Sequence, residues 1–307
     1  MEAKILTSEW YGLASSLGAA VVWSLSTSIY RKYGVGKSPI WLNLFKCIVA
    51  LMCFSVILII DSGGGGQADL RVHMVLAASG VVGVLLGDSA FFAALPYIGA
   101  TMTSAIQCLA PPLTGVLAWM FLGESLGLTR VAGLMVTSTC LAGLIWFESR
   151  DGTRANPDFN GVGFRQGLKF SILAAVCQAT GAVIARPVLD GVSPIVSSAG
   201  RLWLPVIILM MIESRRAGGY WQAVRGLASG REAIFLSIGA FLGTFLGLTL
   251  MMYGMANAPL GVSLALTSTY PVWIMIGERI FGTGTISRRG SLLVVGSVAG
   301  IWLMVWN

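Results

Sequence analysis

The stretch "GLASSLGAAVVWSLSTSIYRKYGVGKSPIWLNLFK", residues 12–46, decides the fold because the chain contains a second copy of it. A shift of 155 positions, with no gap, places it on residues 167–201 with 12 identical residues in 35. Each copy has a long apolar run followed by Ser-Pro-Ile, and each ends on a cation, Lys46 or Arg201. The chain is therefore predicted to contain one structural unit twice.

The repeat continues beyond this stretch. "GVLLG" at 83–87 corresponds to "GTFLG" at 243–247, and Pro112 corresponds to Pro271. These matches predict two units of similar length, with a connecting segment between them. We place the first unit at residues 1–147, the connecting loop at 148–166 and the second unit at 167–307.

The composition indicates an integral membrane protein. Of 307 residues, 56% are hydrophobic and 11% are charged, with a mean hydropathy of +0.81, whereas a soluble domain carries about a quarter charged residues. The apolar residues form runs of roughly 18 to 25, the length of a helix that crosses a bilayer. Because backbone groups cannot stay unpaired in lipid, these runs are predicted to be helices. The ten runs are 11–30, 39–60, 73–94, 100–122, 130–147, 167–185, 194–212, 234–256, 259–281 and 290–306.

Ten such helices in two repeats predict an inverted architecture. Each unit has five helices, an odd number, so the second unit must enter the membrane from the other side. Two units of opposite orientation are typical of secondary transporters, in which the substrate site lies between the halves near the membrane midplane. The fold class is therefore an all-α membrane protein with two inverted five-helix repeats.

Several function classes find little support in the sequence. The chain has one histidine, and its five cysteines form no CxxC pair, so we expect no metal site and no cofactor. It contains no phosphate-binding GxxxxGK[ST] loop and no HExxH or GxSxG motif, so we expect it not to be an enzyme. The net charge of +7 is not gathered in a basic domain, so we expect no nucleic-acid partner.

Three segments resemble the EamA-type branch of the drug/metabolite transporter superfamily. They are "AAVVWSLSTSIYRK" (19–32), "SPIWLNLFK" (38–46) and "LAPPLTGVLAWMFLGESLG" (109–127). The resemblance implies ten helices in two EamA repeats. It also implies movement of small metabolites without ATP by a multi-pass protein of the cytoplasmic membrane.

Lys46 and Arg201 are the first candidates for substrate binding. Charges inside a membrane cost roughly 2.5–3.5 kcal/mol each on insertion scales, so they normally face protein or water. At matching places in both halves, the two cations are predicted to flank a central cavity and bind an anionic group such as a carboxylate. The alternative is that both side chains extend to the lipid headgroups, because each lies only about 10 Å of helix from a proline.

Two carboxylates are candidates for coupling to protons. Asp88 in "LLGDSAFF" lies near the centre of its run, where it would either bind a transported proton or form a structural ion pair with Lys46. Glu278, late in the ninth run, would bind a proton or pair with Arg201. Alternatively, it lies at the membrane interface.

Uncharged residues complete the predicted substrate site. Trp23 and Gln178 are equivalent in the repeat, and Gln107 and Tyr270 precede the prolines of the two units. Together they predict a lined pocket. The alternative is helix–helix hydrogen bonding for the polar side chains and ordinary packing for Trp23.

These features predict a secondary active transporter that works by alternating access, with proton coupling as an option. An amino acid or a derivative is the leading substrate. The alternatives are efflux of hydrophobic or cationic drugs, or a membrane scaffold that transports nothing. The expected partners are the lipid bilayer and a small-molecule substrate, and the chain is expected to be a monomer or a homodimer. The loop charges, thirteen Arg and Lys against four, place both termini outside, whereas the family resemblance places them inside.

Overall fold

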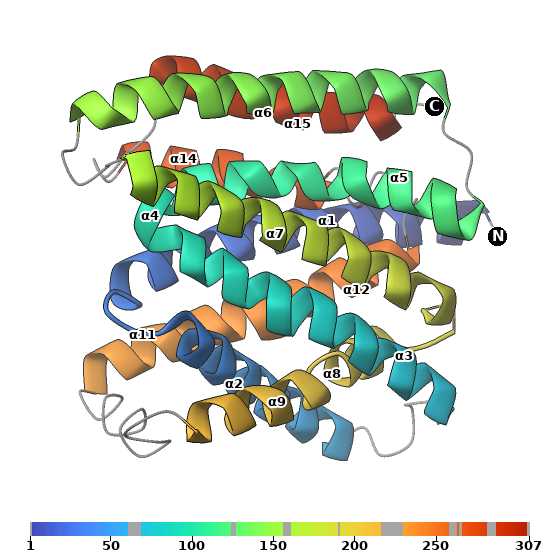
Figure 1. Ribbon diagram of the computed structural model, residues 1–307. Helices are drawn as coiled ribbons and strands as arrows, with labels where there is room; N and C mark the ends of the chain where they lie inside the picture. The colour runs from blue at the N-terminus through green and yellow to red at the C-terminus, as the bar shows by residue number, and fades with distance from the viewer. Residues whose placement is uncertain are drawn as a thin grey trace.

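The computed structural model describes residues 2–60, 69–123, 127–155, 161–189, 191–215, 230–257, 263, 266–280 and 287–305, in which all regular structure is helical (Figure 1). The helices of the first half are α1 (Glu2–Tyr33), α2 (Pro39–Ile60), α3 (Leu70–Gly80), α4 (Ser89–Ile106), α5 (Ala110–Leu122) and α6 (Leu128–Ala155). Those of the second half are α7 (Gly161–Ala185), α8 (Pro194–Gly200), α9 (Trp203–Ser214), α11 (Gly230–Ala240), α12 (Leu248–Asn257), α14 (Tyr270–Ile280) and α15 (Arg288–Val305).

Short segments of other helix types join some of these helices. Two are π-helices, η1 (Val81–Asp88) and η4 (Phe241–Gly247), and two are 3₁₀ turns, η2 (Gln107–Leu109) and η3 (Arg186–Val188). Both α6 and α7 extend into the segment 148–166 that was expected to be a connecting loop, since α6 ends at Ala155 and α7 begins at Gly161. The predicted unit boundaries stay predictions.

Six segments of the described chain are long and apolar enough to cross a membrane: Trp10–Tyr33, Pro39–Ile60, Leu70–Phe121, Val162–Val188, Pro194–Ser214 and Gly230–Met255. One of them, Leu70–Phe121, has 52 residues, more than twice the length of one crossing. Gly99 interrupts it with φ 74°, a left-handed conformation that glycine adopts readily and that ends a right-handed helix. This segment therefore consists of two helices. The count of ten crossings remains a prediction.

The two halves pack together in a symmetric pattern. Helix α1 packs against α11, η4 and α12, and its repeat equivalent α7 packs against α3, η1 and α4. Two further pairs, α2 with α9 and α6 with α15, join equivalent helices of the two halves directly. In Figure 1, α1 runs from right to left and α7 from left to right. This opposite sense is the arrangement expected of an inverted repeat.

The two π-helices occupy equivalent places in the repeats and lie against the helices of the opposite half. A Cβ atom added to Gly87 of η1 would lie 3.2 Å from the Cβ of Cys177 on α7. A Cβ atom added to Gly247 of η4 would lie 2.5 Å from Nε1 of Trp23 on α1. Glycine at both positions therefore permits close approach of the backbones. π-Helical turns are rare and are found frequently at functional sites.

Candidate functional site

Asp88, the last residue of η1, lies where helices from both halves meet. Its Oδ2 accepts a hydrogen bond of 2.6 Å from Nζ of Lys46 on α2. Its Oδ1 accepts one of 2.7 Å from Nε2 of Gln178 on α7. Lys46 is only 6% exposed, so it forms an ion pair with the half-buried Asp88 inside the helix bundle and does not extend to the headgroups. The sequence left two roles open for Asp88, a structural ion pair with Lys46 and proton coupling. The ion pair is present, and proton coupling stays a prediction.

Arg201 is a buried cation without a carboxylate partner among the residues that the structure describes. It is 4% exposed, and its Nε is buried with no hydrogen-bond partner. A Cβ atom added to Gly83 of η1 would lie 3.0 Å from its Nη2, so the guanidinium lies directly against this π-helix. A buried charge that lacks a partner is strongly unfavourable. This guanidinium therefore lacks the compensation that a buried charge needs.

The backbone at Arg201 is also unusual, because the helix breaks there. α8 ends at Gly200 and α9 begins at Trp203, and the amides of Arg201 and Leu202 bond three residues back, to Ser198 and Ala199. The positive end of the α9 dipole therefore starts beside the guanidinium. Ser198 is fully buried, and its hydroxyl has no hydrogen-bond partner.

Three electrostatic interactions connect these groups. Lys46 and Arg201 are close enough to interact electrostatically, and their predicted place beside a substrate cavity stays a prediction. Asp88 interacts electrostatically with both Arg201 and Tyr270. Tyr270, the first residue of α14, also contacts Trp23 on α1, with ring centroids 6.2 Å apart in an edge-to-face arrangement. The structure thus brings Lys46, Gln178, Arg201 and Tyr270 around Asp88, with Trp23 in contact with Tyr270.

Trp23 and Gln178, which are equivalent in the repeat, make matching hydrogen bonds. Nε1 of Trp23 donates to the carbonyl oxygen of Gly243 in η4 at 2.9 Å. Nε2 of Gln178 donates to the carbonyl oxygen of Gly83, the equivalent glycine in η1, at 3.2 Å. Each side chain therefore anchors a π-helix of the opposite half. Gln178 differs in that it also donates to Asp88.

Gln107 and Glu278 are the two remaining residues of the predicted site. Nε2 of Gln107 in η2 donates to the carbonyl oxygen of Ser171 on α7 at 3.1 Å, so it forms a helix–helix hydrogen bond, the second of its two predicted roles. Glu278 belongs to α14, two turns after Tyr270. Its side chain lies outside the described residues, so its predicted coupling role stays a prediction.

Asn43 is a positioning residue that sequence reasoning missed. It is fully buried on α2, and its Nδ2 donates to the carbonyl oxygen of Val84 at 2.8 Å and to Oγ of Ser89 at 2.9 Å. These bonds position the π-helix that ends in Asp88. The available signal was spacing, because residues three apart share a helix face and Asn43 lies three residues before Lys46.

Comparison with known proteins agrees with this architecture. The sequence matches the EamA-like transporter family over residues 10–146 and 165–306, one match for each repeat. The chain belongs to this family and is a multi-pass membrane transporter of the drug/metabolite transporter type. Members of the family are generally transporters rather than enzymes.

One solved structure, described only as the crystal structure of a protein, has the same fold. It superposes with a TM-score of 0.68 at 16% sequence identity, and the match covers 95% of this chain and 94% of that one. No curated protein matches the sequence.

Proposed function

We propose that the chain is a secondary active transporter for a small polar metabolite that carries a carboxylate, with amino acids and their derivatives as the leading substrates. The observation that carries this proposal is Arg201, a guanidinium that is 4% exposed and has no acidic partner among the described residues. A bound carboxylate would supply the missing negative charge through charge-assisted hydrogen bonds.

The balance of charge in the site supports an anionic group on the substrate. Two cations, Lys46 and Arg201, are buried near a single carboxylate, Asp88, and that carboxylate is already bonded to Lys46 and Gln178. An incoming carboxylate could therefore bind Arg201, which has no ion pair among the described residues, and could share Lys46 with Asp88. A cationic drug would instead meet an excess of positive charge, which disfavours drug efflux.

The location of the site supports alternating access. Asp88 and Lys46 belong to the first half of the chain, whereas Gln178 and Arg201 belong to the second. A substrate held by Arg201 and Lys46 would therefore bridge the halves, and its binding energy could drive their relative movement. We place this carrier in the cytoplasmic membrane.

Asp88 is the proposed coupling group. A proton on Asp88 would cancel its charge and release Lys46 for the substrate carboxylate, so proton binding and substrate binding would favour one another. Glu278 is the second proposed coupling carboxylate, on the basis of its sequence position alone.

Transport into proteoliposomes tests the proposal. We expect purified protein to move radiolabelled amino acids or their derivatives under an imposed pH gradient, and not the corresponding amines that lack the carboxylate. Arg201→Gln should reduce this transport at least tenfold and Arg201→Lys should reduce it less, because Lys retains the charge. Arg215→Gln is the matched control, because Arg215 caps the same helix α9 at an exposed position.

Three results would overturn the proposal. One is that amines or hydrophobic cations move while carboxylates do not, which is the behaviour of a drug exporter. Another is that no solute moves under any gradient, which is the behaviour of a scaffold. The third is that Arg201→Gln transports a carboxylate as fast as the unmodified protein does.

A further inference from the structure

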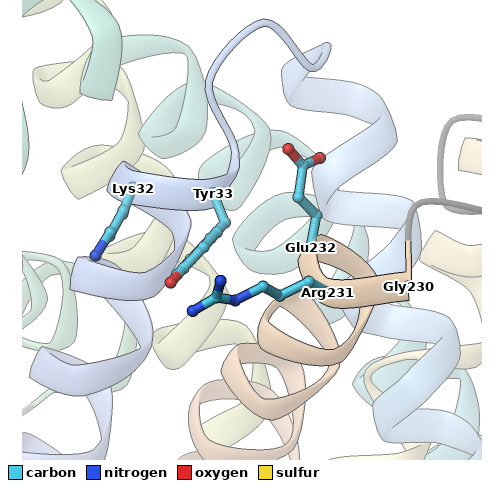
Figure 2. Close-up of a pocket in the computed structure, with 5 residues that line it drawn as sticks. All are labelled: Lys32, Tyr33, Gly230, Arg231 and Glu232. Carbon is cyan, nitrogen blue, oxygen red and sulfur yellow. The ribbon is translucent and has the colours of Figure 1, made fainter.

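A hollow of about 680 Å³ lies at one end of the bundle, between the end of α1 and the beginning of α11. It is lined by Lys32, Tyr33, Gly230, Arg231 and Glu232, which Figure 2 shows. The helices that form it come from opposite halves of the chain. None of these residues belongs to the site around Asp88.

Three hydrogen-bond donors gather on one side of this hollow. In Figure 2 the Lys32 ammonium, the Tyr33 hydroxyl and the Arg231 guanidinium extend in the same direction. Lys32 and Arg231 have no carboxylate partner among the residues that the structure describes. The first turn of α11 begins here as well, and the positive end of its dipole adds to the attraction for an anion.

The one acidic residue of the hollow is already neutralised. Oε2 of Glu232 accepts a hydrogen bond of 3.1 Å from Nζ of Lys37, and Figure 2 shows its carboxylate directed away from Arg231. Tyr33 is held in place because its ring stacks on Phe235 of α11, with centroids 4.4 Å apart and the planes 2° from parallel. The hollow is therefore positively charged, and part of its wall is ordered by a contact between the two halves.

The hollow also lies at the end of an apolar segment that is long enough to cross a membrane. That segment of α1 ends at Tyr33, and the charged residues Arg231 and Glu232 face it across the hollow. Such a position corresponds to the membrane surface. Aromatic side chains such as Tyr33 are typical of the membrane–water interface. The anions present at this depth are the phosphate groups of phospholipids, and anionic lipids are attracted by basic residues near the surface.

We propose that this hollow binds the phosphate headgroup of an anionic phospholipid, with Lys32 and Arg231 contacting the phosphate and the Tyr33 hydroxyl donating a hydrogen bond to it. The lipid would bridge α1 and α11 and so connect the two halves at their surface. This site is independent of the proposed substrate.

Lipid binding to the purified full chain tests this proposal. The protein is placed in nanodiscs of phosphatidylcholine with increasing phosphatidylglycerol, and bound lipid is counted by native mass spectrometry after release. We expect retained phosphatidylglycerol, with about fivefold weaker binding for Lys32→Gln and for Arg231→Gln, since each basic residue near the surface contributes on the order of 1 kcal/mol. Tyr33→Phe keeps the ring that stacks on Phe235 and should weaken binding less than either.

Arg215→Gln is the matched control. It removes a positive charge from an exposed side chain at the end of α9 that does not line the hollow, so it should leave lipid retention unchanged. Equal loss in all three charge variants would overturn the proposal, because it would show general attraction to a basic surface. Retention equal to that of the unmodified protein in Lys32→Gln and Arg231→Gln would overturn it too. So would displacement of the lipid by millimolar inorganic phosphate, which would identify a free anion as the ligand.

Discussion

Lys46 and Arg201 occupy equivalent positions in the two halves of the chain, but of the two only Lys46 has a carboxylate partner in the part of the chain that the structure describes. Asp88 supplies that partner at 2.6 Å, and the residue equivalent to Asp88 in the second half is Leu248. A symmetric scaffold therefore holds an asymmetric set of charges. In the first half Lys46 is balanced by Asp88, whereas in the second half Arg201 has no such carboxylate and is proposed to bind the substrate.

The ion pair of Lys46 and Asp88 should show strong coupling in a double-mutant cycle. Asp88→Leu leaves Lys46 as a buried cation without its carboxylate, and the cost should approach the roughly 3–5 kcal/mol of breaking a fully buried pair. Lys46→Met should cost less, because Asp88 keeps the hydrogen bond from Gln178. The double variant should recover part of the loss. Thermal unfolding in detergent measures all four proteins, and additive losses would contradict a direct interaction.

Two glycines near Arg201 should respond differently to replacement by alanine. At Gly83 the added methyl group would lie 3.0 Å from Nη2, the flexible end of the Arg201 side chain, whereas at Gly80 it would overlap the backbone carbonyl oxygen of Arg201. Gly83→Ala should therefore move the guanidinium and weaken substrate binding about tenfold while the protein stays folded. Gly80→Ala should destabilise the fold by about 1–3 kcal/mol, as overpacking does.

Binding assays and thermal unfolding together separate these two outcomes. The prediction fails if Gly83→Ala binds substrate as the unmodified protein does, or if Gly80→Ala is as stable as the unmodified protein.

The matching hydrogen bonds of Trp23 and Gln178 should contribute unequally to stability. Trp23→Phe removes one bond to the carbonyl of Gly243 and should cost about 1 kcal/mol. Gln178→Met removes the bond to Gly83 and the bond to Asp88, a charged acceptor, and should cost about twice as much. Thermal unfolding of the two variants under the same conditions measures the difference. Equal losses of stability would mean that the hydrogen bond between Gln178 and Asp88 contributes nothing to stability.

Asn43 and its repeat equivalent Ser198 should have opposite roles. Asn43→Leu removes the donor of hydrogen bonds to Val84 and Ser89 and leaves buried acceptors unpaired, at a cost of about 1–3 kcal/mol. The Ser198 hydroxyl has no hydrogen-bond partner to lose, so Ser198→Ala should not destabilise the protein. It should instead weaken substrate binding, because the hydroxyl lies one turn before Arg201. Substrate binding unaffected by Ser198→Ala would exclude this hydroxyl from the site.

Much of the site was predictable because it follows from the repeat. The shift of 155 positions paired Lys46 with Arg201 and Trp23 with Gln178, and charged residues in apolar runs are rarely without a role. The sequence left two roles open for Gln107, a place in the pocket or a helix–helix hydrogen bond. Only the structure shows the hydrogen bond, which goes to a backbone carbonyl on another helix.

The sequence alone determined the class of protein, the duplication and the positions of the buried charges, because lipid requires apolar helices and makes every internal charge conspicuous. Only the tertiary structure decided which charges are paired. Asp88 bonds to Lys46 from its own half and to Gln178 from the other, while Arg201 keeps an unpaired guanidinium against Gly83. The physical reason is that pairing depends on distances of a few ångströms between helices. Those distances are set by π-helical turns, glycine contacts and a helix break that local sequence patterns do not reveal.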